Sequence, residues 1–414
     1  MSEWKETEYG QIPIEWDSMK IEELKAKRKY AISMGPFGSN IKADNFVSIG
    51  VPIIRGTNFN HDRYIGGEFV YLNEEKANEL ISSNCKAGDL VFTHRGTIGQ
   101  VCLIPTGKYD RYVISQSGMK LSLDETIIDN EFLFYFFKSK YGQYQLLKNE
   151  AQVGVPSISN PLTTLKSIKV PVPPLPEQQA IASVLSSLDN KLDLLHRQNK
   201  TLEQLAETLF RQWFIEEADP SWDEKNLDEL VEFNPREKID FQKDYTFYEM
   251  KCLSNDSMSI SDGVKRLVPS ATSYRNGDTL LAKITPCLEN GKIGFVMHLD
   301  TKEIGRGSTE FIVMRNKEKI SPYWIYCLAR SQDFRDIAIL SMSGTSGRQR
   351  VQVDVLKDYK VQVNHDVMNN FHKTVHPYFD KIKVNQIQIR TLTQFRDTLL
   401  PKLMGGEFRV DQNE

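Results

Sequence analysis

Two Asn-Pro steps come nearest to a catalytic motif in this sequence, but neither completes one. A methyltransferase that acts on adenine is expected to carry Asn or Asp, two prolines and an aromatic residue in succession, whereas this chain reads Asn160-Pro161-Leu162 and Asn234-Pro235-Arg236. Asp223-Glu224-Lys225 resembles the end of a nuclease motif, yet no paired acid precedes it in the right pattern. The sequence also lacks a phosphate-binding GxxxxGK(S/T) loop and any HExxH, GxSxG or EF-hand pattern. We therefore predict no catalytic residue in this chain.

The histidines and cysteines are too scattered to predict a metal site. The chain has 7 His and 5 Cys, and no two cysteines form a CxxC pair. His94 has no evident partner for a catalytic triad. We expect no metal ligands, and free thiols of the kind found in a reducing cytoplasm.

The composition indicates an ordinary globular protein. The 414 residues suggest about two to four domains, and the 40% apolar and 26% charged content excludes disordered, collagen-like and disulfide-scaffold classes. A formal net charge of -3 excludes a basic coat over the whole chain, although it allows a local basic face. No apolar run approaches the roughly 18 residues that span a bilayer, and no signal segment is visible. We therefore expect a cytoplasmic protein without a membrane partner.

The elements that must position any functional residue occur twice. Gly88–Ile104 (GDLVFTHRGTIGQVCLI) resembles Gly277–Leu299 (GDTLLAKITPCLENGKIGFVMHL), with the Gly-Asp pairs 189 positions apart. Further along, Lys200-Thr201-Leu202 matches Arg390-Thr391-Leu392 at a separation of 190 positions. Two distant blocks with nearly one offset indicate a tandem duplication.

Each half of the duplication has the pattern of a mixed domain followed by a long helix. Short β-rich runs broken by Gly, Asn and Pro precede a helical stretch at 130–148 in the first half and at 322–340 in the second. The strands are predicted at 51–54, 90–93 and 100–104, and at 279–283, 293–297 and 310–315. This order favours an α+β fold over a doubly wound sheet.

Apolar seams with heptad spacing predict two long helices. Pro176 suits the first turn of a helix, and apolar residues then recur at alternating spacings of four and three up to Trp213, interrupted by Asn199. The positions 190 residues later run from Phe371 to Leu403 and include Asn385. Each seam covers a length on the order of 50 Å at about 1.5 Å per residue.

An antiparallel coiled coil would bury both seams. The register that places Asn199 opposite Asn385 also places Trp213 opposite Phe371. Burying either amide against leucine would cost about 1–3 kcal/mol, so pairing the two amides would set the register. The alternative is that each helix packs only on its own domain.

Two residues disturb the second seam. Pro377 is expected to kink the helix or to mark its true start. Arg396 would face Leu188 and is expected to extend toward solvent.

These features resemble the specificity (S) subunit of type I restriction-modification systems. The most specific pieces are Pro171–Leu195 (PVPPLPEQQAIASVLSSLDNKLDLL), Leu202–Phe214 (LEQLAETLFRQWF) and the duplicated Gly-Asp blocks, and the resemblance covers nearly the whole chain. It implies a pseudo-twofold α+β molecule in which two target-recognition domains alternate with two helical spacers that form the antiparallel coiled coil. The implied domains are 1–175 and 217–365, and the implied spacers are 176–216 and 366–408.

The resemblance also implies function and partners. Such a subunit reads a bipartite sequence in double-stranded DNA, two half-sites with a nonspecific spacer, and the coiled coil acts as a ruler. It docks two methyltransferase subunits that methylate adenine, with or without two restriction subunits. S-adenosylmethionine, ATP and Mg are then expected only on those partner subunits, with no cofactor and no catalysis on this chain.

The second half departs from the family pattern at the entry to its helix. Pro176-Glu177-Gln178-Gln179 corresponds to Asp366-Val367-Met368-Asn369, so the Pro-rich arm is missing there. We expect a looser or differently angled second junction.

Polar turns supply the candidate DNA contacts, because base edges are read by side chains that donate or accept hydrogen bonds. In the first domain the candidates are Arg55, Thr57, Asn58, Thr93, His94, Arg95, Thr97 and Gln116. In the second domain they are Lys283, Thr285, Glu289, Asn290 and Lys292, together with Ser346, Arg348 and Arg350 of a Gly/Ser-rich loop. The alternative for each residue is a solvated surface turn.

Two other functional classes stay open at this point. One is a coiled-coil scaffold that carries two protein-binding or glycan-binding domains. The other is a self-contained enzyme whose active site has no recognisable motif.

Overall fold

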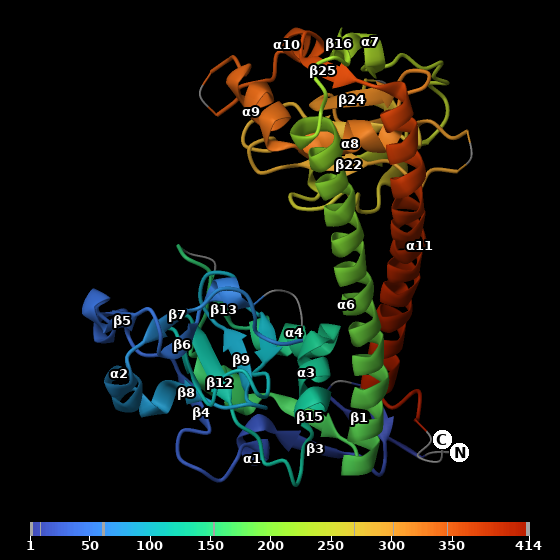
Figure 1. The fold of residues 1–414 in the computed structure, drawn as a ribbon. Helices are drawn as coiled ribbons and strands as arrows, with labels where there is room; N and C mark the ends of the chain where they lie inside the picture. The colour runs from blue at the N-terminus through green and yellow to red at the C-terminus, as the bar shows by residue number, and fades with distance from the viewer. Residues whose placement is uncertain are drawn as a thin grey trace. The chain divides into compact units, whose positions relative to one another are not determined.

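The chain forms two compact units. The computed structural model describes residues 3–8, 10–59, 63–151, 154–268, 270–300, 302–345 and 347–410. Unit 1 comprises Met1–Leu192 with Leu392–Glu414, and unit 2 comprises Asp193–Thr391. Two long helices, α6 (Leu175–Arg211) and α11 (His365–Met404), contribute residues to both units (Figure 1). The compact units divide both long helices, so they do not test the predicted limits between recognition domains and helical spacers. Those limits stay a prediction.

Unit 1 is built on two sheets. Their strands are β4 (Ile32–Met34), β5 (Phe46–Val47), β6 (Val51–Ile54), β7 (Val70–Leu72), β8 (Asn84–Cys85), β9 (Leu90–Thr93), β10 (Val101–Leu103), β11 (Tyr112–Ile114) and β12 (Gly118–Leu121). One sheet has the order β10-β9-β12-β4 and is antiparallel. The other has the order β5-β7-β6-β11-β8, in which only the β6–β11 pair is parallel.

Shorter elements complete unit 1. The helices are α1 (Ile21–Leu24), α2 (Glu74–Glu79), α3 (Asn130–Lys138), α4 (Lys140–Leu147) and α5 (Pro161–Ser167). The small sheets pair β1 (Trp4–Thr7) with β2 (Gly10–Pro13), β13 (Glu150–Ala151) with β14 (Ser157–Ile158), and β3 (Asp17–Lys20) with β15 (Lys169–Val172). The strand β15 leads directly into α6.

Unit 2 repeats this plan. Its strands are β16 (Asp223–Asn226), β17 (Val231–Phe233), β18 (Tyr245–Tyr248), β19 (Val264–Arg266), β20 (Thr272–Tyr274), β21 (Thr279–Ala282), β22 (Ile293–Phe295), β23 (Gly305–Gly307), β24 (Phe311–Asn316) and β25 (Lys360–Val363). Its helices are α7 (Leu227–Leu230), α8 (Pro322–Arg330), α9 (Gln332–Leu340) and α10 (Val353–Lys357). The sheet β22-β21-β24-β17 matches β10-β9-β12-β4, and β19-β18-β23-β20 matches β7-β6-β11-β8, including its one parallel pair. The predicted duplication and the α+β class are confirmed.

The repeated Gly-Asp pairs are turns that start equivalent strands. Gly88 precedes β9 and Gly277 precedes β21, with positive φ angles of 83° and 92° that L side chains rarely adopt. The carboxylates of Asp89 and Asp278 each accept a hydrogen bond from the backbone N–H three residues earlier, at 2.9 and 2.7 Å. The Gly-Asp pair that both halves share therefore reflects a structural turn.

The helical stretches predicted at 130–148 and 322–340 are each two helices. Ser139 separates α3 from α4, and Ser331 separates α8 from α9, both with extended backbone angles. The Ser139 hydroxyl accepts a hydrogen bond from the Gly142 N–H at 3.1 Å and so caps α4. The apolar period continues across both serines, which is why the sequence alone predicts single helices.

The two long helices pack antiparallel in unit 2 with the predicted register. Asn385 Nδ2 donates to Asn199 Oδ1 at 2.8 Å, and the rings of Trp213 and Phe371 lie 6.1 Å apart. The two helices therefore run in opposite directions, with a later residue of α6 opposite an earlier residue of α11. Helix-to-helix packing replaces the alternative in which each helix packs only on its own domain.

In unit 1 the same two helices share one core. Ile181 and Leu185 of α6 belong to the same buried cluster as Leu400 and Leu403 of α11. Within the described ranges, no helix is long and apolar enough to cross a membrane.

Two expectations for the second helix, those for Pro377 and Arg396, need correction. α11 begins at His365 and continues through Pro377 without interruption, so Pro377 does not mark its start. The Asn364 side chain accepts a hydrogen bond from the Asp366 N–H at 2.9 Å, which caps the helix where the first junction uses proline. Arg396 does not extend freely into solvent, because it donates to Asp189 of α6 at 3.0 Å.

Replacing Asn199 alone by leucine is expected to lower the free energy of unfolding by about 1–3 kcal/mol. Asn385 is fully buried, and its amide would lose one of its two acceptors, the other being Gln198. The double change Asn199→Leu/Asn385→Leu removes both amides and should recover most of that loss. Urea unfolding of the three proteins tests the pairing, and a double variant less stable than the single variant would contradict it.

Candidate nucleic-acid interface

Three of the predicted polar turns meet at one edge of unit 1. Arg55 follows β6, Arg95 follows β9, and Gln116 lies between β11 and β12. Since β6 and β11 are parallel, their ends lie together, and the Ser115 N–H donates to the Ile54 carbonyl at 2.9 Å. With Ser115 and its neighbour Ser117, these three residues line a hollow of about 580 Å³.

The hollow presents positive charge that the unit does not neutralise. The side chains of Arg55, Arg95 and Gln116 are exposed. Neither arginine forms an ion pair with any residue in the described part of the chain. Arginine can bind both acceptors on the guanine edge and glutamine can bind the adenine edge, so this set suits base readout. Thr57 and Thr97 are exposed on the same turns.

Three other predicted contacts in unit 1 are structural. Asn58 is fully buried, and its amide donates to two backbone carbonyls at 2.9 Å each. Thr93 is buried and accepts from the Gln100 N–H at 3.0 Å. The buried His94 ring lies 3.1 Å from the Gln116 carbonyl, and burial lowers the pKa of His94. These side chains shape the turns that carry the exposed residues, because their polar atoms already have partners.

The two predicted clusters of unit 2 also come together. The Val351 N–H donates to the Lys283 carbonyl at 2.9 Å, and the Thr285 N–H donates to the Gln349 carbonyl at 3.1 Å. Ile284 and Arg350 form a β-bridge, as Arg95 and Ser157 do in unit 1. The turn after β9 or β21 therefore lies beside the loop after α4 or α9 in each unit.

The predicted DNA contacts in unit 2 differ in whether their side chains are already bonded within the protein. Lys292 is committed internally, since its ammonium donates to two backbone carbonyls at 2.8 and 3.1 Å. Arg350 forms a two-pronged ion pair with Glu310, with N–O distances of 2.6 and 2.9 Å, and this hydrogen bonding lowers the pKa of Glu310. Arg348 is exposed, and no residue of the described ranges forms an ion pair with it.

The remaining candidates of unit 2 are mixed. Glu289 and Asn290 are exposed, Lys283 is half-buried and Thr285 is buried. Ser346 lies outside the described residues.

Comparison with known proteins finds relatives of this chain. Residues 13–204 match the family described as the type I restriction modification DNA specificity domain. The chain is 26% identical to the type I restriction enzyme MjaIX specificity subunit of Methanocaldococcus jannaschii, over 99% of this chain and 98% of that protein. The chain is thus similar over nearly its whole length to a specificity subunit of a type I restriction-modification system. The resemblance noted in the sequence is thereby confirmed.

Two further proteins are similar to this chain. The MjaVIII specificity subunit of the same organism is 28% identical over 49% of this chain and 46% of that protein. The crystal structure of the type I S subunit from M. genitalium shares the fold, with a TM-score of 0.58 and 18% identity over 94% of this chain and 96% of that one.

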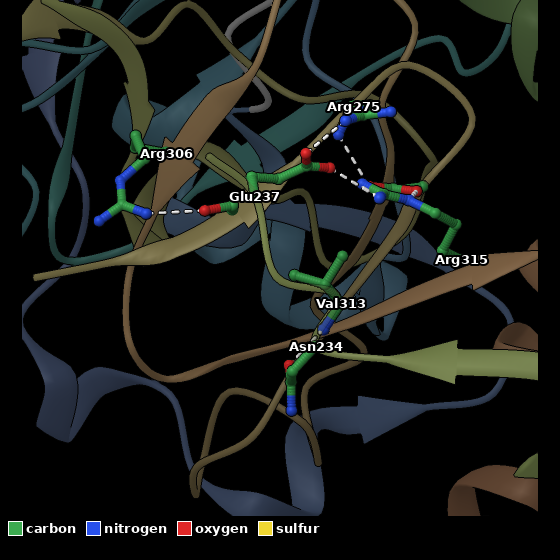
Figure 2. A network of polar contacts seen from close by, with 8 residues as sticks. Asn234, Glu237, Arg275, Arg306, Val313 and Arg315 are labelled. Atoms are coloured by element: carbon green, nitrogen blue, oxygen red, sulfur yellow. Dashed lines mark hydrogen bonds and ion pairs between the residues drawn. The ribbon is translucent and has the colours of Figure 1, made fainter. Parts of the chain in front are cut away.

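A buried ionic network in unit 2 is structural. Arg315 donates to both oxygens of Asp278 at 2.7 and 2.8 Å and to Glu237 at 2.7 Å, and Glu237 also pairs with Arg275 (Figure 2). Burial raises the pKa of Asp278. The equivalent Asp89 in the first unit pairs with Arg28. These arginines hold the Gly-Asp turns, which lie at the start of β9 and β21. The candidate DNA contacts lie at the other end of these strands, and we call that end the contact edge: the turns of Arg55, Arg95 and Gln116 in unit 1 and those of Lys283 and Arg350 in unit 2.

Sequence reasoning missed two residues at the contact edge of unit 1. Ser117 lines the hollow but has no distinguishing spacing in the sequence. Phe37 lies between Gly35 and Gly38, which approach Ser115 and Gln116 of this edge, and its only sequence signal is an aromatic residue between glycines.

Proposed function

We propose that this chain is a specificity subunit that reads a bipartite target in double-stranded DNA, with one half-site for each unit and a nonspecific spacer between them. The observation that carries the proposal is the repeated contact edge. In both units the turn after β9 or β21 lies beside the loop after α4 or α9. Both edges bear exposed arginine without an internal ion pair among the described residues, Arg55 and Arg95 in unit 1 and Arg348 in unit 2.

The proposal includes the partners that catalysis requires. The subunit itself is noncatalytic, and it docks two adenine-methyltransferase subunits, with or without two restriction subunits, in the cytoplasm. S-adenosylmethionine, ATP and Mg belong to those partners. The support is the similarity to specificity subunits together with the absence of a recognisable catalytic motif from the sequence.

Selection from a random duplex pool tests this function. The full chain and its methyltransferase partner are incubated with the pool, and bound duplexes are sequenced and confirmed by fluorescence anisotropy. Two short motifs at a constant separation are expected. One continuous motif would refute bipartite reading, and no enrichment at all would favour a coiled-coil scaffold with two protein-binding domains.

Lengthening both helices by one heptad is expected to lengthen the spacer by about 3 base pairs. Seven residues inserted after Leu192 and seven after Thr391 add about 10 Å of helix, and base pairs are about 3.4 Å apart. Half-site sequences should not change, because the contact edges are untouched. The selection experiment measures the spacing, and an unchanged spacer with intact binding would contradict the ruler.

A heptad inserted in α6 alone serves as the control. It leaves the contact residues in place but shifts Asn199 away from Asn385. This variant should lose stability instead of reading a longer spacer.

A further inference from the structure

Phe37 is held at the rim of the unit 1 hollow by two glycines. The segment after β4 presses onto the turn that lines the hollow. A Cβ on Gly35 would lie 1.8 Å from the Ser115 carbonyl oxygen, and a Cβ on Gly38 would lie 2.6 Å from Gln116 Oε1. The Gly35 N–H also donates to the Gly118 carbonyl at 3.0 Å. Only glycine permits the approach at Gly35, where a Cβ would meet backbone atoms, so the course of the backbone before Phe37 is fixed.

The aromatic side chain of Phe37 is left in solvent. It is 72% exposed, although it stands beside a polar, positively charged hollow. Isolated exposed apolar residues are common on protein surfaces and need no explanation by themselves. Here the residue stands on a backbone segment fixed against Ser115 and Gln116, next to the exposed Arg55 and Arg95.

Unit 2 lacks this feature at the equivalent place. The third residue after β17 is Arg236, whereas the third residue after β4 is Phe37. The segment after β17 is tied down differently, because Asn234 Oδ1 accepts from the Val313 N–H at 3.0 Å and Glu237 pairs with Arg315 (Figure 2). An exposed aromatic residue at this position is therefore a feature of unit 1 and not of unit 2.

The neighbours of Phe37 indicate the chemistry that it meets. Arginine and glutamine side chains on loops suit the acceptors and donors of the major groove. The main apolar group on a base edge in that groove is the 5-methyl group of thymine. Insertion of an aromatic wedge between base pairs is instead typical of minor-groove binding.

We infer that Phe37 contacts the 5-methyl group of one thymine in the half-site read by unit 1, and so selects thymine at that position. This inference rests on the proposed function. Any half-site in which an adenine is methylated contains a thymine, because the methylated adenine is paired with one. Burial of one methyl group against the ring predicts about a fourfold gain in affinity.

Replacement of single thymines by deoxyuridine tests the contact, because it removes only the methyl group. The full chain with its methyltransferase partner is titrated by anisotropy with its selected duplex and with each singly substituted duplex. One position in one half-site should weaken wild-type binding about fourfold. Phe37→Ala should weaken binding to the unmodified target by a similar factor and should no longer distinguish thymine from deoxyuridine there.

Phe46→Ala is the matched control. Phe46 is also exposed, at 46%, but it pairs with Leu72, which lies opposite Val51 at the start of β6 and away from the hollow. The Phe46→Ala variant should bind the target as tightly as the wild type does. The Phe37→Leu variant should keep part of the discrimination between thymine and deoxyuridine. Circular dichroism confirms that each variant is folded.

The outcomes separate this inference from the function on which it rests. Equal wild-type binding to all substituted duplexes would overturn it. Weaker binding by Phe37→Ala with no methyl dependence would indicate insertion between base pairs and would also overturn it. Failure of the wild type to select any bipartite target would instead refute the proposed function, and the inference with it.

Discussion

Replacement of both Arg55 and Arg95 by alanine is expected to weaken binding to the selected target by about 100-fold. A good two-pronged arginine contact to a base is worth about 1–3 kcal/mol, and the two side chains share one hollow. Protein stability should hardly change, because neither arginine has an ion pair among the described residues and both are exposed. Anisotropy with selected and scrambled duplexes measures the effect, and binding to the scrambled duplex should fall much less.

Arg111→Ala provides the matched control for this charge removal. Arg111 precedes β11, at the opposite end of that strand from Ser115, and it donates to Asn78 at 2.7 Å and pairs with Glu74. Such surface pairs are worth about 0–1 kcal/mol, so little stability is lost. Target binding should stay within about twofold of the wild type. Equal losses for Arg111→Ala and the double variant would show that overall charge, and not the hollow, governs binding.

Glu203 makes the stability of unit 2 depend on pH. This residue of α6 is 5% exposed and accepts a hydrogen bond from the Tyr326 hydroxyl, while the nearby Arg330 pairs with Glu207. Burial raises the pKa of Glu203 to about 7, from an ordinary value of 4.5. Between these two values the folded protein keeps a proton on Glu203 that the unfolded chain releases. The contribution of Glu203 is therefore full below pH 4.5 and falls as the pH rises through 7.

The variant Glu203→Gln is expected to lose this pH dependence. Glutamine is uncharged at every pH and can still accept the Tyr326 hydrogen bond. Relative to the wild type it should gain roughly 3 kcal/mol of unfolding free energy as the pH rises from 4.5 to 8, since each pKa unit corresponds to about 1.36 kcal/mol. Urea unfolding of both proteins across this range measures the difference. A difference in unfolding free energy between the two proteins that does not change with pH would contradict the raised pKa of the buried Glu203 carboxyl.

The register of the long helices was predictable because it depends on a local period. The heptad seam and the two asparagines placed Asn199 against Asn385 and Trp213 against Phe371, as the structure confirms. The breaks at Ser139 and Ser331 were missed, because one residue with extended backbone angles can separate two helices without any change in the apolar period.

The contact edge was predictable as a set of turns but not as a surface. The sequence identified the turns of Arg55, Arg95 and Gln116, which the structure brings to one hollow. It could not distinguish Arg95 from its neighbour His94, which is buried and bonded to a backbone carbonyl. Direction of a side chain at a strand end depends on the sheets around it, and residues far apart in sequence supply those sheets.

The sequence by itself determined the duplication, the α+β class and the pairing of the long helices, since these depend on periodicity, spacing and composition. Only the tertiary structure decided which polar residues are free. The side chains of Asn58, Thr93 and Lys292 have partners inside their units, whereas the side chains of Arg55 and Arg95 form no ion pair among the described residues. The physical reason is that an unpaired polar group is costly when buried but costs little in water, so burial set by distant contacts assigns each side chain its role.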